Sequence, residues 1–300
     1  MAMRDFPFFG RINDSHTHVW LGQRLRNRAI LNGQNSAYGE ADSLLELMEQ
    51  NGVKRAAVIT PTTLGFDNSL TLEISKAYEN RFVPIVRIDP YANNVESQIN
   101  RMLMMGARGF RISTNNSKDG SPLGDPVLKP FAKVLSREQI PLLLHCNFDQ
   151  LHLVSELAAE NPGLPILIDH LARVVPNEEI DGPIFKQLAG LARFKNIHVK
   201  ISSTNYFAKE PIKHSDLIPY IDALLVAYGD ERLLWGSDWP LSDVDYEYIN
   251  SFEPLLTMAD EFGMPSLERV LADNFDSLFD RGNRKDWEVQ LTGGANAKNP

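Results

Sequence analysis

Eight short apolar runs recur along the chain, and longer segments with the pattern of amphipathic helices lie between them. The runs have the length of strands, are rich in Val, Ile, Leu or Phe, and occupy residues 12–18, 55–60, 82–88, 107–113, 140–146, 165–170, 197–202 and 233–238. Several are almost continuously hydrophobic, as strands buried on both faces of a sheet are. The alternation predicts a parallel α/β sheet, and eight repeats favour a single closed (β/α)8 barrel, the TIM barrel, over an open sheet.

Several of the predicted helices have recognisable ends. Ser43 and Glu46 have the spacing of a capping box, which predicts a helix that begins near residue 43 and stops at Gly52. Gly106 and Gly229 are likewise expected to end helices. The other expected helices cover residues 95–105, 128–138, 150–161, 183–193, 217–228, 251–262 and 265–271, with a last short helix capped by Asn274.

The chain is predicted to form one domain. Its 300 residues suit a single barrel, and no internal repeat or linker divides them. The barrel is assigned to residues 1–281, and the polar segment 282–300 is expected to be a flexible tail. Two long irregular segments, 20–41 and 115–125, follow strands and are therefore expected at the C-terminal mouth of the barrel.

The composition and charge of the chain bear on its classes of binding partner and on its cellular compartment. The formal net charge is −9 and no Lys/Arg run is present, which disfavours a basic nucleic-acid-binding face. No apolar run approaches the roughly 18 residues of a membrane span, and the N-terminus lacks the features of a signal peptide. The single cysteine, Cys146, excludes an intrachain disulfide and fits a reducing compartment. We expect a cytoplasmic protein that binds neither nucleic acid nor membranes, and we leave a homo-oligomer open.

Four histidines and one aspartate stand where predicted strands end. His16 and His18 close the first run and point the same way, because side chains alternate between the faces of a strand. His145 closes the fifth run, His170 the sixth and Asp238 the eighth. In a barrel these strand ends meet at the catalytic mouth. Imidazole is a common neutral metal ligand, so the set indicates a site for acid–base or metal chemistry.

The alternative is a purely structural role for these residues. His145 and His170 would then be satisfied core histidines, and Asp238 would cap the turn that follows the last strand. Chance would have to place four polar groups at strand ends within otherwise apolar runs, so we favour a functional role. Surface or packing roles are expected instead for the three remaining histidines, which are His152, His198 and His214.

Together, these motifs resemble a known family. The segment from Asp14 to His18, the strand-end histidines and the segment from Trp235 to Pro240 are similar to the amidohydrolase-related branch of the amidohydrolase superfamily. Segments 168–173 and 199–202 narrow the resemblance to the subgroup of 2-pyrone-4,6-dicarboxylate lactonase and sugar-acid lactonases. The resemblance extends from about residue 12 to residue 279, nearly the whole chain.

The resemblance implies a metal site made of His16, His18, His145 and Asp238, which would hold one divalent ion, with zinc expected. His145 matches the fifth-strand histidine that completes the site in decarboxylase-like members. His170 matches the histidine that polarises or protonates the substrate, and Asp238 would also be the general base. Some lactonases of the subgroup need no metal and often lack the fifth-strand histidine, so a metal-independent mechanism stays open.

Arginines near the predicted mouth suit a small anionic substrate. Arg173 lies three residues beyond His170, Arg111 falls at the end of the fourth run, and Arg87 lies near the end of the third. Guanidinium groups bind carboxylates in a bidentate manner, and we favour Arg173 and Arg111 as substrate-binding residues over Arg87. Pocket walls are expected from three aromatic residues, with core or loop packing as the equal alternative: Trp20, Tyr206 and Trp239.

The sequence thus predicts a hydrolase that opens a small carboxylate-bearing lactone, either a sugar-acid or a dicarboxylate lactone. Two alternatives use the same residues: a metal-dependent decarboxylase or C–C hydrolase of an aromatic or unsaturated acid, and a lactone isomerase. They stay open because one barrel supports many reactions. A non-catalytic binding protein is disfavoured, since all five mouth residues are chemically competent.

Overall fold

The computed structural model describes residues 8–20, 41–114, 122–174, 179–203, 214–241, 248–252, 255–256 and 264–280. Within them, eight parallel strands form one sheet in which each strand pairs with the next in the sequence. The strands are β1 (Ile12–Thr17), β2 (Val53–Ile59), β3 (Phe82–Val86), β4 (Gly109–Ser113), β5 (Leu142–His145), β6 (Ile166–Ile168), β7 (Ile197–Ile201) and β8 (Leu233–Trp235). The predicted (β/α)8 barrel is confirmed.

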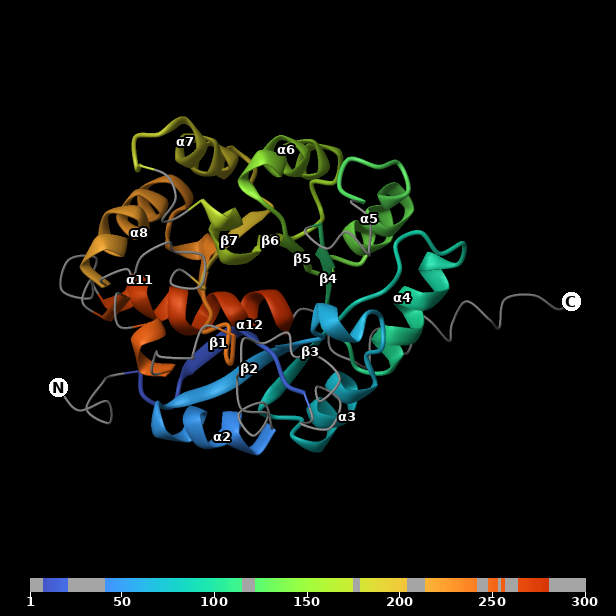
Figure 1. Ribbon diagram of the computed structural model, residues 1–300, viewed down its shortest axis with the longest axis horizontal. Helices are drawn as coiled ribbons and strands as arrows, with labels where there is room; N and C mark the ends of the chain where they lie inside the picture. Colours follow the sequence, from blue (N-terminus) through green and yellow to red (C-terminus); the bar gives the residue numbers. More distant parts are fainter. Residues whose placement is uncertain are drawn as a thin grey trace, which may run out of the picture.

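Helices surround the strands, as Figure 1 shows. They are α2 (Ala41–Gln50), α3 (Ser69–Ala77), α4 (Val95–Met104), α5 (Leu128–Arg137), α6 (Leu151–Glu160), α7 (Pro183–Gly190), α8 (His214–Tyr228), α11 (Met264–Glu268) and α12 (Asn274–Phe279). Shorter helical segments are η3 (Thr62–Leu64), η4 (Phe148–Gln150), η5 (Asp169–Arg173), η6 (Leu191–Arg193), η7 (Asp230–Arg232), η8 (Tyr248–Ser251) and the π-helical η9 (Arg269–Asp273). No helix among the described residues is both long enough and apolar enough to cross a membrane.

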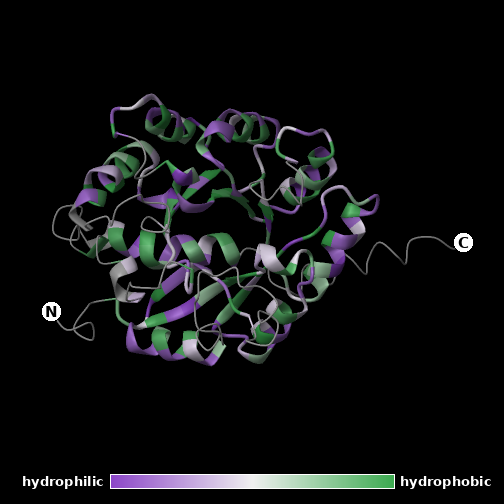
Figure 2. Cartoon of the chain, viewed as in Figure 1, coloured by the Kyte–Doolittle hydropathy of each residue, from purple (hydrophilic) through white to green (hydrophobic). Residues whose placement is uncertain are grey.

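The outer helices are held by the apolar faces that their sequences encode. In α5, Leu128, Phe131 and Leu135 recur at helical spacing and are buried, whereas the solvent side is charged. Phe131 meets Phe110 of β4 edge-to-face, with ring centroids 5.8 Å apart. Burying one such ring contributes about 1.5–3 kcal/mol. Figure 2 shows the same division, with largely hydrophobic central strands and helices that carry both colours.

An apolar plug fills the N-terminal end of the barrel. Inward-facing strand side chains pack there against Phe275, Leu278 and Phe279 of α12, all at most 1 % exposed. In Figure 1 this helix lies between β1–β3 and the strands β4–β7. The buried charged side chains Arg111, Asp169, Lys200 and Asp238 lie toward the opposite, C-terminal end.

The seam between β1 and β8 lies at the mouth. The amide of Asp238 donates to the carbonyl of His16 at 2.8 Å, and the amide of His18 donates to the carbonyl of Trp239 at 2.8 Å. Gly236 is needed for this close approach, because a Cβ atom there would lie 2.9 Å from the Cβ of His16. The bonds that join the first and last strands therefore also fix the candidate site residues relative to one another.

Three details differ from the sequence-based expectations. Ser43 lies inside the first turn of α2 rather than ahead of it. No helix was predicted between β2 and β3, yet α3 forms there; its buried face includes Thr71 and Ser75, which hides the apolar pattern. Asn274 caps no helix: it lies in a continuous helical run, and its amide donates to the carbonyls of Asp230 and Leu233.

The expected glycine stops are confirmed, since Gly52, Gly106 and Gly229 have φ values of 68°, 102° and 71°. The segments predicted as long mouth loops fall mostly outside the described residues, as do most of the helix predicted over 251–262 and the tail predicted over 282–300.

Candidate active site

His16 and His18 lie side by side where β1 ends. Their Nε2 atoms are 3.2 Å apart, and the rings are inclined by 77°. The Nδ1 atom of His18 lies 2.8 Å from the carbonyl oxygen of Ile59, the last residue of β2. Because a carbonyl only accepts, His18 donates from Nδ1, and its Nε2 atom keeps a lone pair on the side of His16.

Asp238 completes a triangle with these two histidines. Its Oδ1 atom lies 3.5 Å from Nε2 of His16 and 3.6 Å from Nε2 of His18. The Oδ2 atom accepts a short hydrogen bond from the hydroxyl of Ser203. Oδ1 is buried and has no hydrogen-bond partner within the described part of the chain. Two imidazole nitrogens and one carboxylate oxygen therefore converge on one point.

His170 is presented by a turn of left-handed backbone. The four residues of 170–173 have φ values of 53°, 53°, 50° and 59° although none is glycine. This conformation costs about 1–2 kcal/mol per residue, and the two central side chains, which are apolar and buried, help to hold it. Nδ1 of His170 lies 2.8 Å from the hydroxyl of Ser202, and its ring centroid lies 4.5 Å from that of His16.

His145 lies on the far side of His170 and is bonded to Arg173. Its Nε2 atom is 2.8 Å from Nη2 of Arg173, and its Nδ1 atom is 3.0 Å from the Ser113 hydroxyl. A guanidinium only donates, so Nε2 of His145 accepts and the ring carries its proton on Nδ1. Arg173 also donates to Oδ1 of Asn147 at 3.2 Å.

The structure thus separates His145 from the other predicted metal ligands. Among the described residues, two groups of three potential ligand atoms lie within 4.8 Å of one another, and neither includes His145. The groups are His16, His18 and Asp238, and His16, Asp169 and His170.

A buried charge network that the sequence analysis did not assign lies beneath the histidines. Lys200, in β7, places Nζ 2.9 Å from Oδ1 of Asp169 and 3.0 Å from Nδ1 of His16. Arg111, in β4, donates from Nε to Oδ2 of Asp169 at 2.8 Å. The side chains of Lys200 and Asp169 are fully buried, and that of Arg111 is 3 % exposed. Arg111, expected at the substrate, therefore lies beneath the histidines with Asp169 as its partner.

A signal for this network was present in the sequence. Asp169 and Lys200 each interrupt a strand run that is otherwise apolar. A charge inside a buried strand needs a partner of opposite sign, and the sequence offers one of each sign on neighbouring strands. Strand pairing between β6 and β7 makes their contact possible.

Burial keeps the four imidazoles neutral. It lowers the pKa of His18 to about 3. It also holds the pKa values of the other three well below the ordinary histidine range, and nearby cations act in the same direction on His16, His145 and His170. Neutral imidazoles retain a lone pair for a proton or a metal ion.

The two carboxylates shift in opposite directions. Burial raises the pKa of Asp238 to about 7, against the hydrogen bond from Ser203, which lowers it. Burial alone would also raise the pKa of Asp169, but the contacts with Lys200, His16 and Arg111 together outweigh it, and the pKa lies well below its usual value. Burial lowers the pKa of Lys200, which the charge of Asp169 opposes. Asp238 is therefore suited to exchange a proton near neutral pH, whereas Asp169 stays ionised.

The first donor group fits a divalent ion. A tetrahedral zinc ion with bonds of about 2.0–2.1 Å needs ligand atoms about 3.3 Å apart. The three separations among His16, His18 and Asp238 are 3.2, 3.5 and 3.6 Å, and the partnerless Oδ1 atom lies at one corner. In the second group, the ammonium of Lys200 already lies between His16 and Asp169. The first group is therefore the candidate metal site.

Of the predicted wall residues, Trp20 and Trp239 are buried. The ring of Trp20 is nearly parallel to that of His18, with centroids 6.2 Å apart. Tyr206 lies outside the described residues. Arg87 is buried, donates to the carbonyl of Gly65 at 2.7 Å and lies over the Phe66 ring, so its side chain packs against the segment that follows β2.

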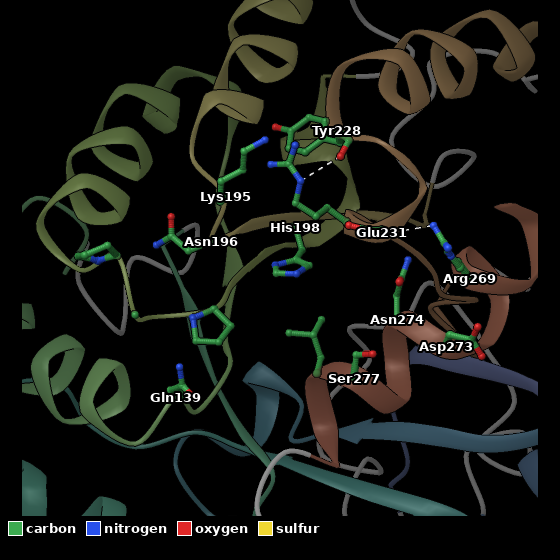
Figure 3. Close-up of a pocket in the computed structure, with 15 residues that line it drawn as sticks. Gln139, Lys195, Asn196, His198, Tyr228, Glu231, Arg269, Asp273, Asn274 and Ser277 are labelled. Atoms are coloured by element: carbon green, nitrogen blue, oxygen red, sulfur yellow. Dashed lines mark hydrogen bonds and ion pairs between the residues drawn. The ribbon is translucent and has the colours of Figure 1, made fainter.

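A separate cavity of about 640 Å³ opens at the opposite end of the barrel (Figure 3). Its lining includes Pro165, Asn196 and Arg232, each of which precedes a strand. The ring of His198 also lines it, so this histidine lies away from the mouth, as predicted. His152 is exposed on α6, and the side chain of His214 is not among those described.

A family model described as Amidohydrolase matches residues 13–265. The chain belongs to the amidohydrolase family. The match covers the sheet from the second residue of β1 through β8, and with it every strand-end histidine and Asp238. The predicted superfamily and the predicted hydrolase class of this amidohydrolase are thereby confirmed.

Two relatives of this amidohydrolase are lactone hydrolases by name. The chain is 29% identical to a 4-sulfomuconolactone hydrolase from Hydrogenophaga intermedia over 242 residues, 79% of this chain and 78% of the relative. It is 25% identical to an L-fucono-1,5-lactonase from Burkholderia ambifaria over 239 residues, 76% and 80% of the two chains. The fold matches a zinc-bound amidohydrolase structure from Burkholderia multivorans with a TM-score of 0.77, at 17% identity over 90% and 99% of the chains.

Proposed function

We propose that this amidohydrolase opens a small lactone that carries a negatively charged group, such as a sugar-acid or dicarboxylate lactone. The observation that carries the proposal is the buried Oδ1 atom of Asp238, which faces two imidazole nitrogens and has no partner in the described part of the chain. A carboxylate with a pKa of about 7 in this position suits a general base for water. The two relatives named above, both lactone hydrolases by name, support the substrate class.

Asp238 moves the protons in the proposed reaction. Its carboxylate accepts a proton from a water molecule as the water oxygen bonds to the lactone carbonyl carbon. The ring C–O bond of the resulting tetrahedral intermediate then breaks, and Asp238 returns the proton to the leaving alkoxide. The product is the open-chain hydroxy acid, and the enzyme regains its starting protonation state.

His170 stabilises the negative oxygen of that intermediate. Its Nδ1 atom lies 2.8 Å from the Ser202 hydroxyl, and Nε2 is the nitrogen proposed to donate to the substrate. The left-handed turn at 170–173 fixes the ring beside His16 without a flexible linker. A donor fixed before the reaction stabilises developing charge without the cost of reorienting, which is the main source of catalysis at oxyanion sites.

Arg173 is proposed to bind the anionic substituent, with His145 as its positioning residue. The contact between Nε2 of His145 and Nη2 of Arg173, and the contact of Arg173 with Asn147, direct the planar guanidinium. A fixed guanidinium favours bidentate binding of a carboxylate or sulfonate. Arg111 donates to Asp169 and is proposed to hold this carboxylate in place beside Lys200.

His16, His18 and Asp238 are the residues that would hold a divalent ion, with zinc expected. Such an ion would lower the pKa of a bound water to about 7 and so supply hydroxide near neutrality. His145 is left out of this set because its lone pair accepts from Arg173. Three protein ligands would leave one position open for water or substrate, as in catalytic zinc sites, so the metal-dependent decarboxylase is left to the assay below.

The test is a turnover assay on a panel of lactones. Purified protein is given 4-sulfomuconolactone, 2-pyrone-4,6-dicarboxylate and sugar-acid lactones, with uncharged δ-valerolactone as the control. We expect at least one anionic lactone to be opened with a kcat/KM at least about 10-fold above that of the neutral lactone, since a charge-assisted hydrogen bond contributes about 1.5–3 kcal/mol. Turnover in ¹⁸O-water should place one label in the acid product.

Chelation followed by zinc addition separates the remaining alternatives. Release of carbon dioxide from an aromatic acid, lost on chelation and restored by zinc, would replace the lactonase with a decarboxylase. A rearranged lactone without label would indicate an isomerase. No turnover of any anionic lactone would overturn the proposal.

A further inference from the structure

The nearest partner of His16 on its Nδ1 side is the ammonium of Lys200. Nζ lies 3.0 Å from Nδ1, whereas Oδ1 of Asp169 lies 3.4 Å away. All three side chains are fully buried. The usual companion of a metal-binding histidine is a carboxylate or carbonyl that accepts its second N–H. Here a cation occupies that place.

Burial disfavours the charged form of Lys200, and the contact with Asp169 favours it. Its Nζ atom lies 2.9 Å from Asp169, which is itself held by Nε of Arg111. The other charged groups that act on Lys200 are Arg111, which opposes its charge, and Asp14, which favours it. Removing one member of a buried ion pair leaves an uncompensated charge, so Asp169 ties Lys200 into the fold as an ammonium.

The chemistry of an ammonium then decides the tautomer of His16. An ammonium has three N–H donors and no acceptor, so Lys200 can meet Nδ1 only if that nitrogen has its lone pair. A neutral imidazole with a lone pair on Nδ1 carries its proton on Nε2. That proton points into the triangle formed with His18 and Asp238, where the candidate metal site lies.

We propose that Lys200 is a positioning residue that holds the proton of His16 on Nε2, in the place where a divalent ion would bind. His18 has the opposite tautomer, fixed by the carbonyl of Ile59, so the two neighbours form a matched donor and acceptor at 3.2 Å. The Nε2 proton of His16 thereby occupies the place where an ion would bind. An ion can bind only if this proton leaves Nε2. The inference rests on the proposed function for its catalytic meaning, but not for its test.

This assignment explains how one constellation can serve with or without an ion. Without an ion, the Nε2–H of His16 donates to the lone pair of His18, and the Nε2 atom lies 3.5 Å from Oδ1 of Asp238. Freeing Nε2 for an ion requires Nδ1–H to turn to Asp169, and Lys200 occupies the nearer position. Zinc affinity is therefore set below what the three ligands alone would give.

The experiment reads the tautomer directly, on chelator-treated full-length protein labelled with ¹⁵N-histidine. Two-bond ¹H–¹⁵N spectra distinguish Nδ1–H from Nε2–H, and loss of signals in His16→Gln assigns His16. Lys200→Met keeps the volume and removes the donors, and Lys200→Arg keeps donors. Zn²⁺ binding is measured by titration calorimetry on the same samples. Lys195→Met, on an exposed lysine just before β7, is the matched control.

We expect Nε2–H on His16 in the wild type, Lys200→Arg and Lys195→Met. In Lys200→Met we expect Nδ1–H and a zinc Kd at least about 10-fold lower. Nδ1–H in the wild type, or an unchanged tautomer and zinc Kd in Lys200→Met, would overturn the inference. If Lys200→Met does not fold, the wild-type tautomer and Lys200→Arg decide. If no lactone is turned over, the proposed function is wrong, whereas the measured tautomer of His16 and the zinc Kd still test this inference.

Discussion

The two ends of this barrel are built on opposite principles. At the mouth, imidazoles, carboxylates, a lysine and an arginine are buried together, and the backbone is repeatedly left-handed. Among the described residues, six of the seven non-glycine positions with positive φ lie there, in segment 170–173 and at Ser203 and Asp238. At the N-terminal end, which we call the base of the barrel, the inward-facing strand side chains and α12 form an apolar plug of Leu, Ile, Val, Ala and Phe.

The contrast shows where stability and function reside. Buried charges and left-handed residues at the mouth each cost of the order of 1–3 kcal/mol unless neighbours compensate. The hydrocarbon at the base offsets such costs, since each large side chain buried there contributes about 1.5–3 kcal/mol. Mutations at the mouth should therefore impair activity more than stability, and mutations at the base should do the reverse.

The largest effect is expected for Asp238→Asn. The amide cannot take a proton from water, so kcat for an anionic lactone should fall by about 10²–10⁴-fold, the range of general-base catalysis. The thermal midpoint should stay close to that of the wild type, because the fold already holds this side chain uncharged below its pKa of about 7. Steady-state kinetics and thermal unfolding check both halves. Near-normal turnover would remove Asp238 as the base.

The converse prediction concerns the N-terminal end of the barrel and is made for Phe279→Ala. This ring is 1 % exposed and packs 4.9 Å from that of Phe275. Its removal should lower the free energy of unfolding by about 3–5 kcal/mol, as measured in urea. The kcat per folded molecule should be unchanged. A large loss of kcat in the folded fraction would show that the two ends are coupled, and the contrast would fail.

The sequence predicted the base of the barrel and part of the mouth, for different reasons. Buried parallel strands give near-continuous apolar runs, so the eight strands could be located from the positions of these runs along the chain. His16, His18 and Asp238 converge because the ends of parallel strands meet at one edge, whatever the details of packing. The α3 helix was missed because two of its buried positions are Thr71 and Ser75.

What the sequence could not supply is pairing in three dimensions. The left-handed turn at 170–173 contains no glycine, so no residue type within it predicted this backbone conformation. The bond between His145 and Arg173 depends on that turn, and His145 lies outside both groups of potential metal ligands among the described residues. Likewise, the contacts that join Lys200 to Asp169 and His16 link β7 to the start of η5 and to β1, and single-sequence patterns do not report such contacts.

A smaller effect, confined to binding, is expected at Arg173. In Arg173→Lys the bidentate contact is lost while the charge is kept, so KM for an anionic lactone should rise by about 10-fold or more, with kcat changed far less. The neutral lactone should show no change in KM, which makes it the internal control. Equal losses of kcat for both substrates would mean that Arg173 supports the fold of the mouth and not substrate binding.

His145→Gln should give a still smaller change in KM. It also distinguishes the two roles considered for this residue, which are positioning Arg173 and binding a metal ion. A positioning residue for Arg173 predicts a several-fold rise in KM, since one hydrogen bond contributes about 0.5–1.5 kcal/mol. Zinc content after dialysis should match that of the wild type, because His145 is outside both donor groups. Loss of bound zinc in His145→Gln, measured by elemental analysis, would restore it to the metal set.

The smallest predicted effect is a change in pH dependence at Ser203→Ala. Asp238 has a raised pKa of about 7, so the ionised base is scarce below that pH and kcat/KM of chelator-treated enzyme should rise as the pH passes through 7. The Ser203 hydroxyl donates to the charged form and lowers the pKa, so its removal should move this limb to higher pH. The shift should be about one unit or less, because a hydrogen bond is worth about 0.5–1.5 kcal/mol and one unit about 1.4 kcal/mol. A limb that stays in place, or moves to lower pH, would mean that the group titrating in the profile is not Asp238. The plateau rate at high pH should stay near the wild-type value, since the ionised base is then fully present in both proteins.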